Sequence, residues 1–356
     1  MAEREAGYSS WRGIAQAIKT EADRAAKSGE SSLNVNEQIV QANHDRFLSR
    51  VFADGQDSEW LLKGGTAMLA RVPKGRATKD LDLAATNAAD LDAAQEALER
   101  AASRDLGDHI RFQLTGARET GLGQNQPGVD TRRLVFTAQD AGTGRKLFDV
   151  PIDVVVGPPP VGRVETAEPS NRLQLGRPIE THPYRLFPIS DQIAEKVTAT
   201  MDSYAGRPSS RVKDLVDLVT IARTQTVDMR ELQMAIDAKR ALSRTPPFTE
   251  FAIPDDWERS YRALAMKTPA ARDLDVHEAV ALAKQLVDPA LVDEPVPDGL
   301  TWVPGHGWTD DPDAAAADVE EAPPGGDVHV TGHVRAGHPV TEHWRSARGA
   351  RNAGSS

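Results

Sequence analysis

The sequence predicts a protein of the α+β class, with mixed α/β content, for three reasons. Apolar side chains return every three to four positions in residues 10–52 and 190–287, which is the period of amphipathic helices. Residues 59–157 instead contain short segments that are continuously apolar or alternate polar and apolar side chains, which is typical of strands. Hydrophobic residues make up 39% of the 356 residues, so the chain is long enough and apolar enough to form a sizeable core.

Four regions follow from these patterns. Residues 1–52 are expected to form amino-terminal helices, with the segments WRGIAQAIKTEADRAA and NEQIVQANHDRFLSRVF separated by a turn. Residues 53–188 are expected to form a sheet domain and residues 189–287 a helical domain. Residues 288–356 read as an acidic tail rich in Pro and Gly, which we expect to be disordered because it offers little apolar surface to bury.

The sheet domain is expected to begin with a short buried strand, EWLLK, that ends at Gly64-Gly65, where TAMLAR starts a helix. A half-buried strand follows in KDLDLAAT and an amphipathic helix in ADLDAAQEALERAASRD. Three more strands are predicted in RFQLTG, RRLVFTAQD and KLFDVPIDVVVG. The Pro-rich stretch 157–188 is interpreted as a hinge.

The helical domain is expected to contain helices in SDQIAEKVTATMDSY, RVKDLVDLVTIART, MRELQMAIDAKRAL, DWERSYRALAMK and DVHEAVALAKQLV. In the tail, Trp302, Trp308 and Trp344 are unusual for a disordered segment, and docking onto a partner or onto the protein's own core is a hypothesis for all three. Deleting residues 290–356 is nevertheless expected to leave the chemistry unchanged.

The charge distribution is uneven along the chain. The formal net charge is −11, but residues 287–327 hold eleven acidic and no basic side chains, which leaves residues 1–286 nearly neutral. The total charge therefore gives no argument for or against a nucleic-acid partner. No cysteine is present, which excludes disulfides and thiol catalysis and fits a cytoplasmic location. The sequence contains no long apolar run, so we expect neither a membrane span nor a cleaved signal peptide.

Three carboxylates are candidates for a metal site. Asp80 and Asp82 alternate on a predicted strand, so both project to one face while Leu81 and Leu83 face the core. Asp153 interrupts the apolar run PIDVVVG, where an unpaired acid would cost several kcal/mol. A hard cation such as Mg²⁺, or Mn²⁺, is the natural partner of such a cluster. Surface carboxylates at Asp80 and Asp82 and an ion pair at Asp153 remain alternatives.

The glycine pair is a candidate anion site. A strand that ends in Gly-Gly at a helix start lets backbone N–H groups approach a phosphate. A plain tight turn is the alternative, and the spacing is not that of a Walker A loop. The side chains that could add hydrogen bonds or charge to a bound nucleotide are Lys63, Thr66, Arg71 and Arg76.

Two further candidates border apolar helical stripes. Lys196 lies at the edge of the stripe in DQIAEKVTATM, and Asp214 lies at the edge of the stripe in RVKDLVDLVTIA. Side chains at such borders can reach a cleft, or can simply pair with one another. A Lys196–Asp214 ion pair is the alternative to a functional role.

Taken in order, these segments resemble the polymerase-beta type of nucleotidyltransferase and, more closely, the AbiEii toxin family of type IV toxin–antitoxin systems. The matching segments are KGGTAMLAR, RATKDLDL, IAEKVTA and RVKDLVDL. The sequence departs from the family at Thr78-Lys79, where a serine or threonine followed by an acid is more usual. Lys79 would thus place a cation near the metal.

The resemblance implies a polymerase-beta-like core with a mixed sheet and a role for each candidate. Asp80, Asp82 and Asp153 would bind the metal and, with Lys196 and Asp214, form the catalytic set. The nucleotide would be bound by Lys63, Gly64, Gly65, Thr66, Arg71, Arg76 and Asp217. The enzyme would transfer a nucleoside monophosphate from a triphosphate to an acceptor hydroxyl and release pyrophosphate.

The acceptor implied by the resemblance is the 3′ end of tRNA, whose modification would inhibit translation, and a cognate antitoxin is an expected partner. Transfer to a small molecule or to a protein side chain is the alternative within enzymes. A catalytically silent nucleotide-binding module is the alternative outside them. A tRNA acceptor would require basic side chains around the cleft. The candidates, if they share one face, are Arg71, Lys74, Arg76, Lys79, Arg132, Arg133, Arg145, Lys146, Arg207, Arg211 and Lys213.

Overall fold

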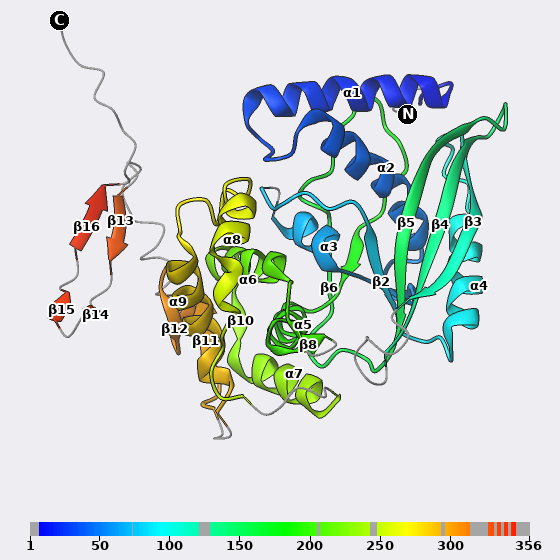
Figure 1. Cartoon of the computed structure of the whole chain (residues 1–356). Coiled ribbons are helices and arrows are strands. Elements are labelled where there is room, and N and C mark those ends of the chain that lie inside the picture. The colour runs from blue at the N-terminus through cyan, green and yellow to red at the C-terminus, as the bar shows by residue number, and fades with distance from the viewer. Residues whose placement is uncertain are drawn as a thin grey trace, which may run out of the picture.

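The computed structural model describes residues 7–72, 74–120, 129–204, 207–242, 248–292 and 296–313, and four short strands beyond them. Figure 1 shows a sheet with helices on one side of the molecule and a helical bundle on the other. The helices are α1 (Trp11–Ser28), α2 (Val35–Val51), α3 (Gly64–Arg71), α4 (Leu91–Ala102), α5 (Ile189–Met201), α6 (Val212–Thr224), α7 (Met229–Leu242), α8 (Glu258–Ala265) and α9 (Val276–Val287), with 3₁₀ turns at η1 (Gly55–Asp57), η2 (Asp255–Trp257) and η3 (Asp288–Ala290).

Seven of the described strands form one mixed sheet, in the order β3-β4-β5-β2-β1-β7-β6. Strands β2 and β5 are parallel, as are β1 and β7, and the other neighbours are antiparallel. The α+β prediction is confirmed. The strands are β1 (Trp60–Lys63), β2 (Leu81–Ala85), β3 (Ile110–Thr120), β4 (Asp130–Asp140), β5 (Lys146–Val156), β6 (Glu165–Ala167) and β7 (Tyr184–Leu186).

Strand alternation gives the sheet one apolar face and one polar face. On β4 the side chains of Leu134 and Phe136 are buried on one face of the sheet, whereas Arg133, the residue before Leu134, points to the other face. The apolar face packs against α2 and α4, and Phe47 of α2 lies with its ring centroid 5.0 Å from that of Phe136. The polar face of the same strands is therefore left free for chemistry.

Helix α3 joins the two halves of the molecule. Its residues Ala67 and Ala70 belong to the core of the sheet, whereas Met68 packs into the core of the helical domain. In that second core, α5 and α6 contribute the apolar stripes that the sequence indicated, including Ile193 and Leu215, both fully buried. The start of α3 and the polar edges of α5 and α6 consequently face a common space.

Two parts of the chain contain more structure than the sequence indicated. The Pro-rich stretch interpreted as a hinge supplies β6 and β7, and β7 extends the sheet beside β1. The sequence could not predict that β7 pairs with β1, because a strand of three residues carries too little periodicity to be detected.

Part of the predicted tail is folded against the helical domain. Strands β11 (Thr301–Val303) and β12 (Gly307–Thr309) form a sheet with β10 (Val227–Asp228) of the helical domain. Trp302 is buried and its Nε1 donates to the Ala222 carbonyl at 2.8 Å, and Trp308 Nε1 donates to Gln285 at 3.0 Å. Docking onto the protein's own core is thus confirmed for Trp302 and Trp308, whereas the side chain of Trp344 lies outside the described residues. A deletion that begins at residue 290 would expose this core, so the prediction that it is harmless needs revision.

The remaining described strands are short pairs. They are β8 (Ser203–Tyr204) with β9 (Arg207–Pro208), β13 (Asp327–Val330) with β16 (His343–Ser346), and β14 (His333–Arg335) with β15 (His338–Val340). Other residues of the predicted tail beyond Asp313 lie outside the described residues. None of the described helices combines the length and apolar character that crossing a membrane demands.

Candidate active site

A row of charged residues crosses the polar face of the sheet. The register pairs Arg118 of β3 with Arg133 of β4, and Arg133 with Asp153 of β5. Asp153 is in turn opposite Asp82 of β2, and Asp82 is opposite Lys63 of β1. Directly opposed residues share a face of the sheet. The row therefore brings together five residues from five strands, with the two acids at its centre.

Asp80, just before β2, lies beside this row and shares a counter-ion with Asp153. Arg133 Nη2 lies 2.8 Å from Asp80 Oδ1, and Arg133 Nη1 lies 2.8 Å from Asp153 Oδ2. The side chains of Asp80 and Asp153 are 40% and 30% exposed, so this bridge is open to solvent. Burial raises the pKa of Asp153, and Arg133 offsets part of that effect. Asp153 thus keeps a tendency to bind another cation or a proton.

Asp82 is the least well neutralised of the three acids. The pKa of Asp82 is raised because its carboxyl is buried and because Asp153 lies close to it. Nearby lysines, Lys63 first among them, offset only part of this shift. An acid in that condition is stabilised by a cation brought from solution.

The structure explains both glycines of the pair. Gly64 has a φ of 62°, and a Cβ at that position would lie 1.9 Å from Asp82 Oδ2. A Cβ on Gly65 would lie 2.9 Å from Thr78 Cβ. The pair therefore lets the start of α3 approach the acidic row and the residues preceding β2. No side chain caps the amino terminus of α3, so its first N–H groups remain as donors for a ligand.

A second cluster lies on the helical side and is buried. Lys196 Nζ lies 2.6 Å from Asp217 Oδ2 and 3.5 Å from Asp214 Oδ1. Arg76 reaches across from the sheet domain and donates to both oxygens of Asp217, at 2.7 and 2.8 Å. Although burial opposes ionisation, Lys196 and Arg76 lower the pKa of Asp217 to about 2. The predicted Lys196–Asp214 pair is present, but Asp217 is the nearer partner.

A third set links the sheet to α7. Lys63 Nζ lies 2.6 Å from Glu195 Oε1, and Lys239 Nζ lies 2.9 Å from the same atom. Burial would raise the pKa of Glu195, but the two ammonium groups lower it to about 2. Lys63 also lies 4.3 Å from the centre of the Phe187 ring. Lys63 and Lys196, from different domains, are thus both held by acids at the wall of one cavity.

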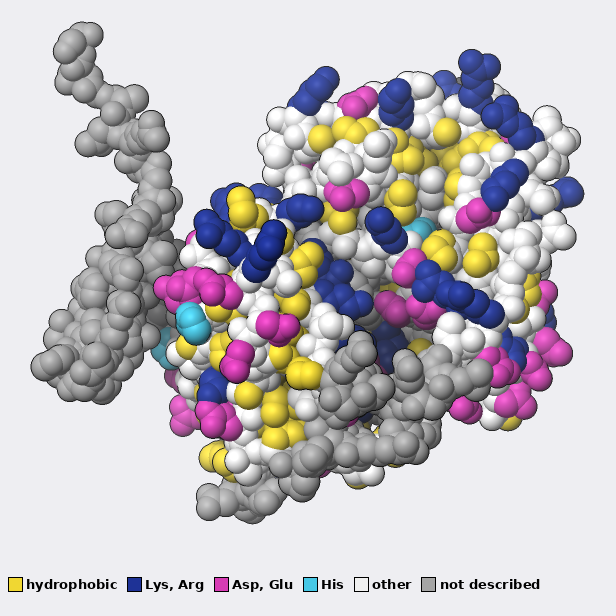
Figure 2. Space-filling view, in the orientation of Figure 1, with side chains coloured by type: hydrophobic (Ala, Val, Ile, Leu, Met, Phe, Trp, Pro, Cys, Tyr) yellow, Lys and Arg dark blue, Asp and Glu magenta, His cyan; other side chains and the backbone are white. Residues whose placement is uncertain are grey.

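This cavity has a volume of about 220 Å³ and lies between the sheet and the helical domain. In Figure 2, basic and acidic side chains meet in a hollow between these two parts of the surface. Its lining residues come from β1, α3, the segment before β2, β2 itself, β5, α5 and the start of α6: Lys63, Gly64, Gly65, Arg76, Thr78, Asp80, Asp82, Asp153, Val155, Gln192, Glu195, Lys196, Arg211, Lys213 and Asp214.

Most of the predicted site residues therefore meet at one place. All five predicted catalytic residues line the cavity, as do four of the predicted nucleotide-binding residues: Lys63, Gly64, Gly65 and Arg76. Three of the predicted nucleotide-binding residues, Thr66, Arg71 and Asp217, do not line it. Asp217 is buried behind Lys196, and Arg71 donates instead to Glu165 and to the Phe187 carbonyl. Lys79, expected near the metal, is exposed and does not line the cavity either.

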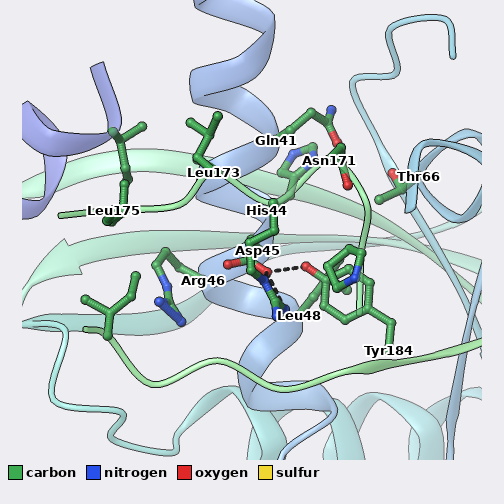
Figure 3. A pocket seen from close by; sticks show the side chains of 15 residues that line it. Gln41, His44, Asp45, Arg46, Leu48, Thr66, Asn171, Leu173, Leu175 and Tyr184 are labelled. Carbon is green, nitrogen blue, oxygen red and sulfur yellow. Dashed lines mark hydrogen bonds and ion pairs between the residues drawn. The ribbon is translucent and has the colours of Figure 1, made fainter. Parts of the chain in front are cut away.

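Thr66 lies on the opposite side of α3. It lines a separate cavity of about 30 Å³ under α2, together with His44, Asp45 and Tyr184 (Figure 3). Its Oγ1 donates to the backbone carbonyl of Asp80 at 3.2 Å. Thr66 therefore fixes the backbone of a predicted metal ligand, rather than contacting the nucleotide cavity.

Two residues of the site, Glu195 and Arg118, were not among the sequence-based candidates, and Arg133, Arg211 and Lys213 were candidates only for binding a tRNA acceptor. A signal for Arg133 was present, because it alternates with the apolar residues Leu134 and Phe136 in RRLVFTAQD and must lie on the polar face. Glu195 carried no comparable signal, since its partners lie on β1 and α7.

The carboxylates fit a divalent cation only after a rearrangement. Among the described residues, no three acidic or histidine side chains are already gathered as a metal-binding group. Asp80 and Asp153 are instead spanned by the Arg133 guanidinium, a cation located between the two acids. Because the acids converge on a positive group, and because the pKa of Asp82 is raised by burial and by Asp153, the donor set suits a hard cation.

Residues 46–283 match the nucleotidyl transferase AbiEii toxin family of type IV toxin–antitoxin systems. The match covers more than half of the chain, and the protein belongs to this family. It is accordingly a nucleotidyltransferase toxin of a toxin–antitoxin system.

Solved structures with a similar arrangement include two bacterial proteins. MenT4, a nucleotidyltransferase toxin from Mycobacterium tuberculosis H37Rv, is 16% identical, with a TM-score of 0.44 over 79% of this chain and 97% of its own. JHP933 from Helicobacter pylori is 13% identical, with a TM-score of 0.36 over 70% of this chain and 93% of its own. A search of the curated proteins found no match.

Proposed function

We propose that this toxin transfers a nucleoside monophosphate from a nucleoside triphosphate to the 3′ end of tRNA, with Mg²⁺ or Mn²⁺, and so inhibits translation. The observation that carries the proposal is the cavity, where incompletely neutralised carboxylates face the uncapped start of α3. Carboxylates of this kind favour a divalent cation, and free N–H groups favour phosphate. A nucleoside triphosphate with its metal combines both chemistries.

Asp80, Asp82 and Asp153 would hold the metal. When bound, the metal would neutralise charge on the phosphates and favour the ionised form of the attacking hydroxyl. Asp82 lies closest to the phosphate side of the cavity, because Gly64 leaves no room between them. Asp153 has a raised pKa, which suits a carboxylate that accepts a proton.

The protein's own residues would then accept a proton and hold the phosphates in position. The acceptor O–H would give its proton to the Asp153 carboxylate as the oxygen forms a bond to the α-phosphorus. The bond from that phosphorus to the β-phosphate oxygen breaks, and pyrophosphate leaves. Gly64, Gly65 and Lys63 would hold the leaving phosphates at the start of α3.

Lys196 and Arg76 would contribute as fixed cations. Lys196 is only 7% exposed, and Asp217 and Asp214 raise its pKa although burial opposes this. Its ammonium is therefore charged and held in one position, which limits the reorganisation needed when phosphate binds. Asp217 would act indirectly, by positioning Lys196 and Arg76.

Exposed cations at the rim support a polyanionic acceptor. Arg211 and Lys213 are exposed and line the helical side of the cavity, and Arg118 is exposed on β3 opposite Arg133. Phosphate backbones are recognised mainly through such side chains. A tRNA could thus lay its 3′ end in the cavity while its backbone contacts both domains. Such a toxin would act in the cytoplasm and be restrained there by a cognate antitoxin.

Labelled nucleotides test the proposal. The full-length protein is incubated with each of the four α-labelled triphosphates, Mg²⁺ or Mn²⁺, and either total tRNA, total protein or a panel of aminoglycosides. Metal-dependent label in tRNA, and its loss in Asp80→Ala, is the expected result. Label in protein or in the small molecules would move the acceptor to those classes. Absence of label and of released pyrophosphate in every reaction would indicate a silent nucleotide-binding module.

A further inference from the structure

Arg133 bridges two of the carboxylates that would hold the proposed metal. Its two terminal nitrogens divide between Asp80 and Asp153, each at 2.8 Å, so one guanidinium spans two of the three predicted ligands. Arg133 comes from β4, a strand that contributed none of the predicted metal ligands. Asp82, the third ligand, has no place in this bridge and lies behind it in the charged row.

We propose that Arg133 is an internal counter-ion that competes with the divalent cation for Asp80 and Asp153 and must leave them before the metal binds. In the metal-free protein it prevents repulsion between the two acids. In the metal-bound protein it is released toward the open side of the sheet. Arg133 is therefore a residue that sets the metal affinity of the site.

The exposure of the bridge makes the exchange feasible. The Arg133 side chain is 22% exposed and both acids are more exposed than that. Ion pairs that water can reach are weak, in contrast to the buried pairs of the helical side. A divalent ion also carries twice the charge of a guanidinium and can contact Asp82 as well. Binding energy thus favours the metal once it is present at sufficient concentration.

The neighbouring residue in the row gives the released side chain a role. Arg118 is directly opposite Arg133 on β3, is exposed, and acts on Asp153 electrostatically. Two guanidinium groups side by side repel each other unless an anion lies between them. Release of Arg133 would consequently create a site for a phosphate of the nucleotide or of the acceptor.

Metal binding without any nucleotide tests the inference, which relies on the proposed function only in taking a divalent cation as the ligand. Mn²⁺ is titrated calorimetrically into the full-length protein and into Arg133→Met, Arg133→Lys and Arg118→Met. Arg133→Met is expected to bind Mn²⁺ about tenfold more tightly, because the metal no longer has to break a charge-assisted contact between residue 133 and a carboxylate. Arg133→Lys, which cannot bridge two carboxylates, is expected to bind about threefold more tightly.

Arg118→Met is the matched control, because it removes a cation from the same row without touching a carboxylate. Its affinity for Mn²⁺ is expected to change less than about twofold. Affinity in Arg133→Met equal to or weaker than that of the wild type would overturn the inference and leave the metal site intact. If Arg133→Met does not fold, unchanged affinity in Arg133→Lys overturns it equally. Absence of Mn²⁺ binding in all four proteins would overturn the metal assignment itself.

Discussion

The two walls of the cavity hold similar numbers of charged groups but treat them differently. On the sheet wall, Asp80 and Asp153 share one exposed arginine, and burial together with Asp153 raises the pKa of Asp82. On the helical wall, Asp217 is buried between Lys196 and Arg76, and its pKa is lowered to about 2. The sheet wall is therefore short of positive charge, whereas the helical wall is already neutral. We infer that the first wall binds cations and that the second holds its own cations in place.

The largest effect is expected from Asp82→Asn. Removing this ligand should lower nucleotide transfer by about 10³-fold, because a bound metal contributes several kcal/mol to such a reaction. The free energy of unfolding should rise or stay unchanged, since the charge that is removed is one that burial disfavours. Transfer is measured with labelled triphosphates and stability with urea. Loss of stability parallel to activity would contradict the contrast between the walls.

Asp217→Asn should have the opposite profile. Breaking a buried ion pair leaves Lys196 and Arg76 without their shared partner, which typically costs about 3–5 kcal/mol. The control is Asp273→Asn, which removes an exposed acid paired with Arg223 at 2.6 Å and should cost less than about 1 kcal/mol. Urea unfolding of both variants decides the matter. Equal costs would mean that the helical cluster is not a locked network.

Gly64→Ala tests how the walls are joined. Gly64 and Gly29 both have positive φ, 62° and 71°, so alanine should cost each of them about 1 kcal/mol of backbone strain. Only at Gly64 would the new Cβ meet another group, the Asp82 carboxylate. Gly64→Ala is therefore expected to weaken Mn²⁺ binding by about tenfold, whereas Gly29→Ala leaves it unchanged. Calorimetric titration of both variants compares them, and matching affinities would argue against this close approach.

The smallest effect is a dependence of stability on pH. Glu195 and Asp217 have folded-state pKa values lowered from 4.5 and 3.8 to about 2. Their contributions are complete above these unfolded values and are lost as the pH falls from about 4.5 toward 2. Asp82 has a raised pKa, so its protonation on acidification favours the folded state. Urea unfolding between pH 7 and pH 3 should show a smaller acid loss for Glu195→Gln than for the wild type. An equal loss would show that Glu195 is not held by its lysines.

The sequence predicted much of this arrangement because the information was local. Alternation around DLDL and PIDVVVG placed Asp82 and Asp153 on a polar face, and helical stripes placed Lys196 and Asp214 at cleft borders. It could not place Thr66, which is one residue from Gly65 but lies on the other side of α3. It also treated Asp217 as a nucleotide contact, since only the approach of Arg76 from another domain reveals that Asp217 is already paired.

By itself the sequence determined the class of fold, the family and the identity of the acids, because periodicity and short motifs depend on neighbours along the chain. Tertiary structure decided which basic side chains neutralise those acids. Arg133 is 20 positions from Asp153 and 53 from Asp80 in the sequence, yet the register of β4 with β5 brings it to both. Charge neutralisation depends on distance in space, where the interaction energy falls with separation. The contrast between a wall that binds a cation and a wall that holds one was therefore settled only when the strands and helices came together.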